Sequence, residues 1–193
     1  MEFLVHHLRF VPCKELISLS LIIKGHSENH PECTNLAIQS LVSFIKFDPT
    51  FKDVFREMGM IEVLAGVLKL HLNQINEATS SPSQMVLGER VTSILVELLD
   101  GNGPNAAVFR DSDGLATLIS FCKFDDAKVR AGALSLFEQL IIGGGNENDM
   151  TALLELIHRF RDNYAIENEV IHSVIFCLRE SHKSRTIFRY PIF

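Results

Sequence analysis

Features typical of nucleic-acid-binding and aromatic-rich recognition proteins are scarce in this sequence of 193 residues. It has no tryptophan and only 2 tyrosines beside 14 phenylalanines, which does not favour an aromatic-rich recognition surface. Asp and Glu (24) outnumber Lys and Arg (18), so the formal net charge is -6. Because binding to phosphate backbones depends on a strong positive field, we expect no nucleic-acid partner.

Membrane-spanning runs and a secretion signal are missing as well. No stretch approaches the roughly 18 apolar residues of a membrane span, and the N-terminus lacks a basic region followed by an apolar one. The cysteines Cys13, Cys33, Cys122 and Cys177 lie far apart, three of them in apolar helical contexts, as small buried side chains do. A reducing compartment fits best, and we predict a cytoplasmic protein without a transmembrane segment.

Internal repeats are the strongest positive signal. Three copies of an aliphatic-Phe-Arg tripeptide occur, at Val54-Phe55-Arg56, Val108-Phe109-Arg110 and Ile187-Phe188-Arg189. Eighteen residues before each Phe, an apolar helical run presents Ala37, Val91 and Val170 on its apolar face. A further run over 129–137 gives the run positions 37, 91, 131 and 170, and the last two spacings are 40 and 39 residues.

The first spacing is longer because a polar stretch without apolar periodicity, residues 73–83, follows the first copy. We predict that it is an inserted loop. Removing about 14 residues restores a period near 40, close to the roughly 40–47 residues of armadillo and HEAT units. The sequence therefore predicts an all-α, right-handed α-solenoid of armadillo/HEAT type with about four repeats.

Each repeat is expected to contain three helices. A long helix over 35–45 is followed by Asp48-Pro49, where a short helix begins, and Gly59 ends the short helix before the next one at 60–68. Residues 1–193 are thus expected to form a single domain: a partial leading unit over 1–33, repeats over 34–72 and 84–193, and the loop at 73–83.

The core of this array is predicted from the apolar faces of the helical runs. The residues expected to be buried are Leu36, Leu41, Phe44, Phe55, Leu64, Leu68, Leu95, Leu98, Phe109, Leu118, Leu134, Phe137, Leu154 and Phe176.

One segment also suggests a family. The block from Val54 to Leu64, with the long polar insertion after it, resembles the armadillo-like region of large BEACH-domain proteins of the Alfy type, which also contain WD repeats and a FYVE domain. The resemblance covers roughly residues 30–140. It implies a very large cytoplasmic scaffold in membrane traffic or selective autophagy. None of the BEACH, WD-repeat or FYVE signatures is in this sequence, so the activities of those domains are not assigned to it.

Two glycine clusters resemble phosphate-binding loops. The stretch 101–106 has the spacing of a dinucleotide-binding fingerprint, but a helical run and not a strand precedes it, so we interpret it as an interhelical turn. The stretch 143–146 lacks the Lys-Ser/Thr of a P-loop and stands where a short helix is expected, so we interpret it as a connection. No cofactor is therefore expected.

A third cluster has zinc-ligand residue types. His26, His30 and Cys33 could supply three ligands, yet a fourth is missing nearby and Pro31 interrupts a helix between the last two. The favoured interpretation is a polar loop with Cys33 turned inward at the start of the next helix, and no metal is expected. A metal-binding enzyme that uses this cluster remains the less favoured alternative.

The residues predicted to bind partners form two groups. Polar helix residues expected to face a protein or peptide on a concave face are Asn35, Gln39, Arg90, Glu97, Arg130 and Glu138. Basic residues that could bind an anion are Arg56, Arg110, Arg179, Lys183, Arg185 and Arg189. For the repeated Arg56, Arg110 and Arg189, packing on their own helices with bonds to local carbonyls is favoured over a shared binding surface.

No set of residues indicates a catalytic nucleophile, so the sequence predicts a non-catalytic interaction scaffold. The alternative is a self-assembling module, since neither terminus carries an obvious polar cap and uncapped ends can associate with one another.

Overall fold

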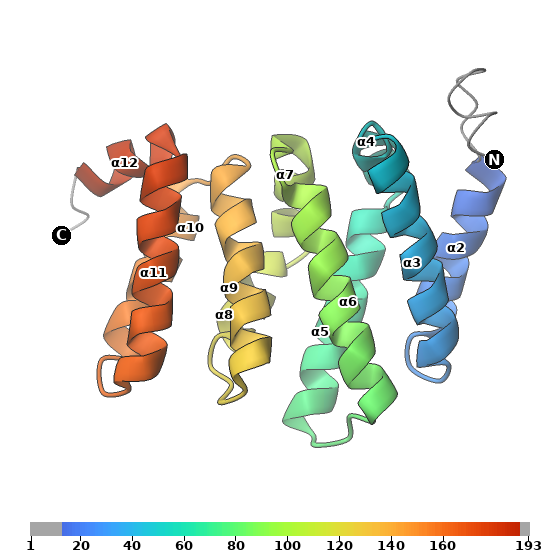
Figure 1. The fold of residues 1–193 in the computed structure, drawn as a ribbon, viewed down its shortest axis with the longest axis horizontal. Helices are drawn as coiled ribbons and strands as arrows, with labels where there is room; N and C mark the ends of the chain where they lie inside the picture. Colours follow the sequence, from blue (N-terminus) through green and yellow to red (C-terminus); the bar gives the residue numbers. More distant parts are fainter. Residues whose placement is uncertain (1–12, 190–193) are drawn as a thin grey trace. The chain divides into compact units, whose positions relative to one another are not determined.

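The computed structural model describes residues 13–189, with the side chains of Ile187 and Arg189 left out of the description. Within this range all regular structure is helical and no strand occurs, which confirms the all-α prediction. The helices in chain order are α2 (Cys13–His26), α3 (Pro31–Phe47), α4 (Phe51–Glu57), α5 (Met60–Asn76), α6 (Pro82–Leu99), α7 (Gly103–Asp111), α8 (Gly114–Phe121), α9 (Ala127–Ile142), α10 (Glu147–Arg159), α11 (Tyr164–Glu180) and α12 (His182–Arg189) (Figure 1). None of these described helices is long and apolar enough to cross a membrane.

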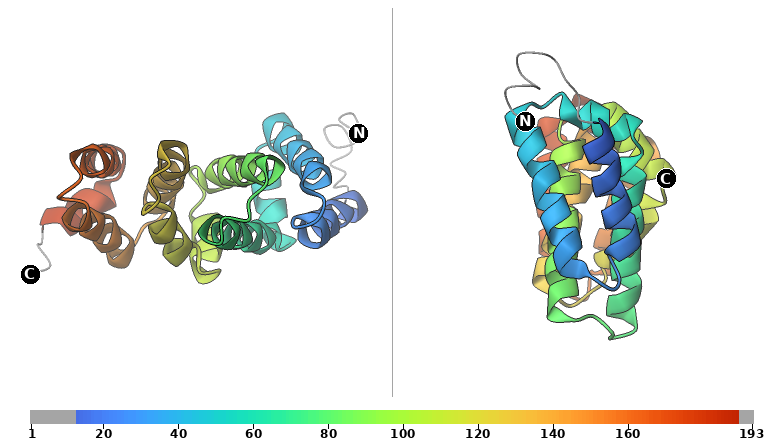
Figure 2. Two further views of the ribbon diagram at one scale, coloured as in Figure 1. Left: turned by 90° about the horizontal axis from the view of Figure 1, so that it is seen from below. Right: turned by 90° about the vertical axis from the view of Figure 1, so that its right-hand side faces the viewer.

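The chain divides into two compact units, with the division between Ile94 and Leu95 inside α6. In the first unit α2 packs against α3 and α5, and the short α4 contacts both α3 and α5. Figure 2 shows α2 and α3 side by side at the blue end of the ribbon. The core of this unit contains Leu16, Ile38 and Phe55, which are essentially inaccessible to solvent.

The second unit is built around α9, which contacts α7, α8, α10 and α11. The helix α12 contacts α10 and α11. Phe109, Leu118 and Phe137 are completely buried in this unit. Phe55 and Phe109, from the first two copies of the repeated tripeptide, therefore occupy the core of their units, while Phe188 of the third copy is 51% exposed.

The predicted order of a long helix, a short helix and a further helix recurs in the structure. It is seen in α3, α4 and α5 and again in α6, α7 and α8. The repeat that begins with α9 lacks the short helix, because α9 ends at Ile142 and α10 begins at Glu147. The glycine cluster at 143–146 is thus a helix connection, as predicted.

The turn between the short helix and the next one differs between the two copies. Gly59 adopts a left-handed conformation with φ of 72°, as expected for a glycine at a sharp turn. At the same place in the second copy, Asp113 takes the left-handed conformation with φ of 61°, and Gly114 instead begins α8. A side chain at Gly114 would overlap the ring and the carbonyl oxygen of Phe109, so this glycine is needed for close packing.

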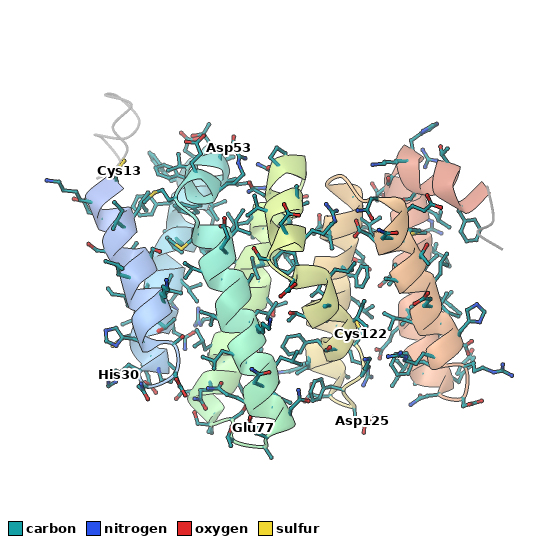
Figure 3. All side chains as sticks on the ribbon, turned by 180° about the vertical axis from the view of Figure 1, so that it is seen from behind. Cys13, His30, Asp53, Glu77, Cys122 and Asp125 are labelled. Carbon is teal, nitrogen blue, oxygen red and sulfur yellow. The ribbon has the colours of Figure 1, made fainter. Side chains whose placement is uncertain are left out.

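The inserted loop is shorter than predicted. The helix α5 continues to Asn76 and α6 begins at Pro82, so only residues 77–81, which include Glu77, connect them (Figure 3). The helix α5 has 17 residues and its counterpart α8 has 8. Both ends of the predicted loop, residues 73–76 and 82–83, are therefore helical. The sequence did not indicate this, because these polar residues lack the apolar periodicity from which a helix is predicted.

Most of the predicted core is buried, but four residues are not. Leu36 is 65% exposed and Phe176 is 39% exposed, while Phe44 and Leu154 are half-buried. Leu36 fails because the buried stripe of α3 runs through 34, 38, 41 and 45, and a residue two positions from both 34 and 38 points to the opposite side of the helix.

The apolar face of α9 is also shifted from its predicted register. Ala131 is exposed, while Arg130, Ala133 and Leu134 are buried. The equal spacing of the sequence runs therefore does not carry over residue by residue to the buried stripe of this helix.

Candidate functional site

The predicted partner-binding residues lie on the first helix of each repeat, and in the first unit three of them lie on α3 and α6. The amide oxygen of Gln39, assigned from the hydrogen-bond network, accepts bonds from Arg90 Nη1 at 2.8 Å and Nη2 at 3.0 Å. Gln39 is exposed, and Asn35 and Arg90 are half-buried. Among the described residues, buried Asn35 Oδ1 and Arg90 Nε find no hydrogen-bond partner. The structure thus joins α3 and α6 through the Gln39–Arg90 pair, while the unpaired Asn35 Oδ1 and Arg90 Nε are buried away from solvent.

In the second unit Arg130 makes hydrogen bonds within the protein. Its Nε donates to Glu169 Oε2 at 3.0 Å and its Nη2 donates to Glu169 Oε1 at 3.1 Å. Its Nη1 donates to the carbonyls of Phe124 at 2.8 Å and Asp125 at 2.7 Å. Because the Arg130 side chain is only 7% exposed, this guanidinium holds α9, α11 and the turn before α9 together and presents little surface to a partner.

Glu97 and Glu138, the other two predicted residues of this unit, differ in exposure. Glu97 is exposed on α6 and can be reached by a partner. Glu138 is half-buried, and this burial raises the pKa of its carboxyl group. A hydrogen bond with Ser173 opposes the rise only in part. Glu138 therefore contacts α11, as Arg130 does.

The repeated arginines do not share one kind of partner. Arg56 pairs locally with Asp53, its Nη1 lying 2.6 Å from Oδ1, and both side chains reach solvent. Arg110 forms a two-pronged pair with Asp149, with Nη2–Oδ2 at 2.7 Å and both carboxylate oxygens 3.1 Å from Nε. The Asp149 side chain is completely buried. The prediction that these arginines bond to local carbonyls is thus wrong for Arg110, because its partner is a carboxylate in another helix.

The C-terminal basic residues lie on α11 and α12. Arg179 and Lys183 are exposed. Arg185 is also exposed, but its Nη1 donates to the carbonyls of Leu178 at 3.0 Å and Arg179 at 2.8 Å, which ties α12 to the end of α11. The side chain of Arg189 lies outside the described residues.

The zinc-type cluster does not assemble into a ligand set. The rings of His26 and His30 lie 5.4 Å apart, and Cys33 is exposed and not turned inward. Pro31 is the first residue of α3 and does not interrupt a helix, as its missing N–H permits at that position. No group of three His, Cys, Asp or Glu side chains within 13–189 is arranged to hold a metal ion.

The start of the glycine stretch 101–106 lies in the turn between α6 and α7, as predicted, while residues 103–106 already form the first turn of α7. Asn102 caps α7 by accepting a bond from the Asn105 backbone N–H at 3.0 Å. A Cβ at Gly103 would lie 2.7 Å from the carbonyl oxygen of Gly143. The glycine therefore permits a close contact between the start of α7 and the end of α9.

Sequence reasoning missed the acidic partners Asp149 and Glu169. Each lies 39 residues after its arginine, close to the repeat spacing. A search for opposite charges one repeat apart would have found both pairs. Sequence reasoning also missed His71, which is 6% exposed on α5 and lies against Gly88 of α6, where an added Cβ would overlap the imidazole ring. Its burial follows only from the continuation of α5 past Leu70, which the sequence did not predict.

Comparison with known proteins relates the chain to WD repeat- and FYVE domain-containing proteins. It is 31% identical over 149 residues to WD repeat- and FYVE domain-containing protein 4 of Homo sapiens, and 27% identical over 198 aligned residues to the Mus musculus protein of the same name. The alignments cover 72% and 98% of this chain. The chain spans only 4% and 6% of the lengths of these relatives.

No protein-family model matches the chain, and no solved structure matches it. The relation to these proteins supports the family resemblance that the sequence suggested. It does not identify the type of helical repeat.

Proposed function

We propose that this chain is a non-catalytic protein-interaction segment of a large scaffold, built as an array of armadillo/HEAT-type repeats. The observation that carries the proposal is the recurrence of the long, short and further helix in α3–α5 and α6–α8. Proteins built from stacked helical repeats bind partners along extended surfaces. The absence of a sequence motif for a nucleophile favours binding over catalysis.

The surface that best suits a partner comprises the exposed polar residues of α3 and α6. We name Gln39 and Arg90, which pair between these helices within the first unit, as the polar face. Arg130 and Glu138 are not included, because both are engaged with α11. An exposed polar side chain such as Gln39 can form specific hydrogen bonds with a partner without a large loss of internal contacts.

The relation to WD repeat- and FYVE domain-containing proteins is consistent with a scaffold in membrane traffic, and we propose selective autophagy as one such process. We also propose that the protein acts in the cytoplasm. Both statements concern a whole protein of which this chain spans a small part.

The proposal is tested by quantitative affinity capture with three versions of the chain. Wild type is compared with the variant Gln39→Lys and with the control Glu155→Lys, which changes an exposed residue of α10. We expect at least one protein that is recovered with wild type and with the control and is depleted at least about tenfold with Gln39→Lys, a change of about 1.4 kcal/mol in binding. Equal recovery with all three versions would argue against the polar face.

Self-association is a second candidate, because both units expose large apolar side chains. In the first unit Ile17, Leu21 and Leu36 are 51%, 64% and 65% exposed, and in the second Tyr164 is 78% exposed. Light scattering over a concentration series distinguishes the two candidates: a constant monomer mass favours partner binding, whereas a mass that grows with concentration favours assembly.

A further inference from the structure

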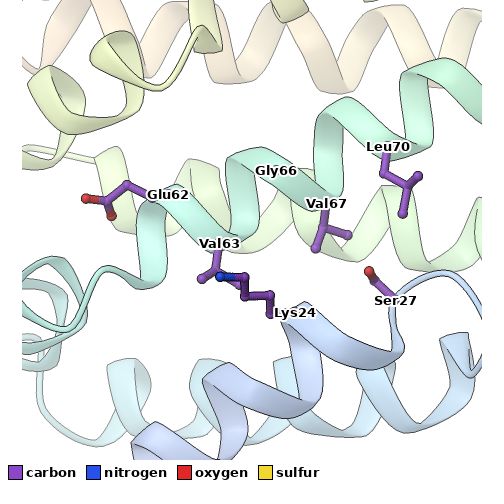
Figure 4. Close-up of a pocket in the computed structure, with 7 residues that line it drawn as sticks. All are labelled: Lys24, Ser27, Glu62, Val63, Gly66, Val67 and Leu70. Atoms are coloured by element: carbon purple, nitrogen blue, oxygen red, sulfur yellow. The ribbon is translucent and has the colours of Figure 1, made fainter.

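A pocket of about 320 Å³ lies between α2 and α5 in the first unit (Figure 4). Lys24 and Ser27 of α2 form one side, and a stretch of α5 from Glu62 to Leu70 forms the other. This site shares no residue with the polar face and has no counterpart among the sites predicted from the sequence.

The α5 side of the pocket is apolar and has a gap at its centre. Val63, Val67 and Leu70 are spaced by four and three residues, so they lie on one face of the helix. Gly66 stands between them, and an added Cβ at this position would meet no atom within 4 Å. The missing side chain thus leaves open space above an apolar surface.

The polar groups around this space have no partners among the described residues. Lys24 and Glu62 are exposed and form no ion pair within 13–189. Ser27 is only 7% exposed, and in the described part of the chain its hydroxyl makes no hydrogen bond. Figure 4 shows this hydroxyl directed toward α5, between Val67 and Leu70. The Ser27 hydroxyl lines the pocket and can form a hydrogen bond with a ligand there.

We propose that this pocket binds a short peptide segment of a partner protein, with an aliphatic side chain above Gly66 and a neighbouring carboxylate paired with Lys24. The volume is at the lower end of the roughly 300–1,000 Å³ of ligand pockets, which suits one or two side chains better than a large cofactor. A peptide also supplies a backbone N–H for the Ser27 hydroxyl and, through a basic residue, a partner for Glu62. The opposite charges of Lys24 and Glu62 favour a ligand that carries both signs.

The inference goes beyond the polar face and does not depend on it. It is tested with two fluorescein-labelled, blocked pentapeptides that contain leucine at the centre, glycine at both ends, and aspartate and lysine on either side of leucine in the two possible orders. Binding to the full chain is followed by fluorescence anisotropy. We expect at least one order to bind saturably and the matching peptide with serine in place of leucine to bind about 10- to 100-fold more weakly, since burial of a leucine contributes about 1.5–3 kcal/mol.

Filling the pocket gives the sharpest test of the site. The substitution Gly66→Leu places a side chain in the open space and improves helix propensity, so the variant is expected to fold with an unchanged or higher melting temperature and to lose at least about tenfold in affinity. The matched control is Gly25→Leu in α2, where an added Cβ also meets nothing within 4 Å but which does not line the pocket. Equal affinity of both variants and wild type would overturn the proposal.

The charge at Lys24 provides an independent readout. Lys24→Glu is expected to weaken binding of the aspartate-containing peptides and to favour peptides in which lysine replaces aspartate, whereas Lys14→Glu, at an exposed position of the same helix outside the pocket, leaves this preference unchanged. If Lys24→Glu and Lys14→Glu alter binding equally, the effect is one of net charge and the assigned pairing is wrong. Neither result bears on the variants of the polar face, so the two proposals fail separately.

Discussion

The guanidinium of Arg110 donates hydrogen bonds from Nε and Nη2 to the buried carboxylate of Asp149, and the shortest of them, Nη2–Oδ2, is 2.7 Å. Asp149 also belongs to a capping box: its Oδ2 accepts from the Asn146 backbone N–H at 2.9 Å, and its own N–H donates to Asn146 Oδ1 at 2.9 Å. One carboxylate therefore fixes the start of α10 and its contact with α7.

We predict that Arg110→Met destabilises the protein by about 3–5 kcal/mol, because it leaves the Asp149 charge buried without its partner. Urea denaturation monitored by circular dichroism measures the free energy of unfolding. The control is Arg56→Met, whose partner Asp53 is 56% exposed, and for which less than about 1 kcal/mol is expected. Similar values for the two variants would contradict the distinction between a buried and a surface pair.

How far the sequence predicts this arrangement depends on the kind of contact. Helices and core residues such as Phe55 and Phe109 follow from local periodicity, which a single helix imposes on its own side chains. The Arg110–Asp149 pair joins helices 39 residues apart, so it depends on how helices pack against each other. The pocket at Gly66 escapes prediction for the same reason, since a glycine inside a helix gives no sign of which neighbour it faces.

We predict that Gly103→Ala destabilises the protein, although alanine is the better helix former. The new Cβ would approach the backbone oxygen of Gly143 to 2.7 Å, and a backbone atom cannot yield as a flexible side chain does. A loss of about 1–3 kcal/mol is expected, as for overpacking of a core. The comparison is Gly25→Ala, which has open space and should gain about 0.5–1 kcal/mol. Thermal unfolding of both variants checks the opposite signs.

We predict a loss of stability in mild acid that depends on His71. Burial lowers the pKa of this histidine, and the charge of Glu89 opposes the shift only in part. The folded state thus binds the proton less readily than the unfolded state, so the stabilising contribution is complete above the unfolded value of about 6.5 and declines as pH falls below it. The unfolding free energy from pH 8 to 5 measures this slope. In His71→Gln the slope should be smaller, and an identical slope would contradict the role of His71.

We predict two classes of thiol reactivity. Burial is the main cause that raises the pKa of Cys122 and of Cys177 to about 12, while Cys13 and Cys33 are exposed. Because the thiolate is the reactive species, iodoacetamide at pH 8 should modify Cys13 and Cys33 in the native protein and spare the other two until denaturant is added. Peptide mapping by mass spectrometry identifies the modified residues. Rapid native modification of Cys122 would contradict the burial of the end of α8.

The most direct test of partner binding through the polar face is hydrogen–deuterium exchange of the chain, free and saturated with a captured partner. We expect the partner to slow exchange in α3 and α6 around Gln39 and Arg90, with smaller changes in α10. Slower exchange confined to α10–α12, with α3 and α6 unchanged, would contradict the proposed interaction surface.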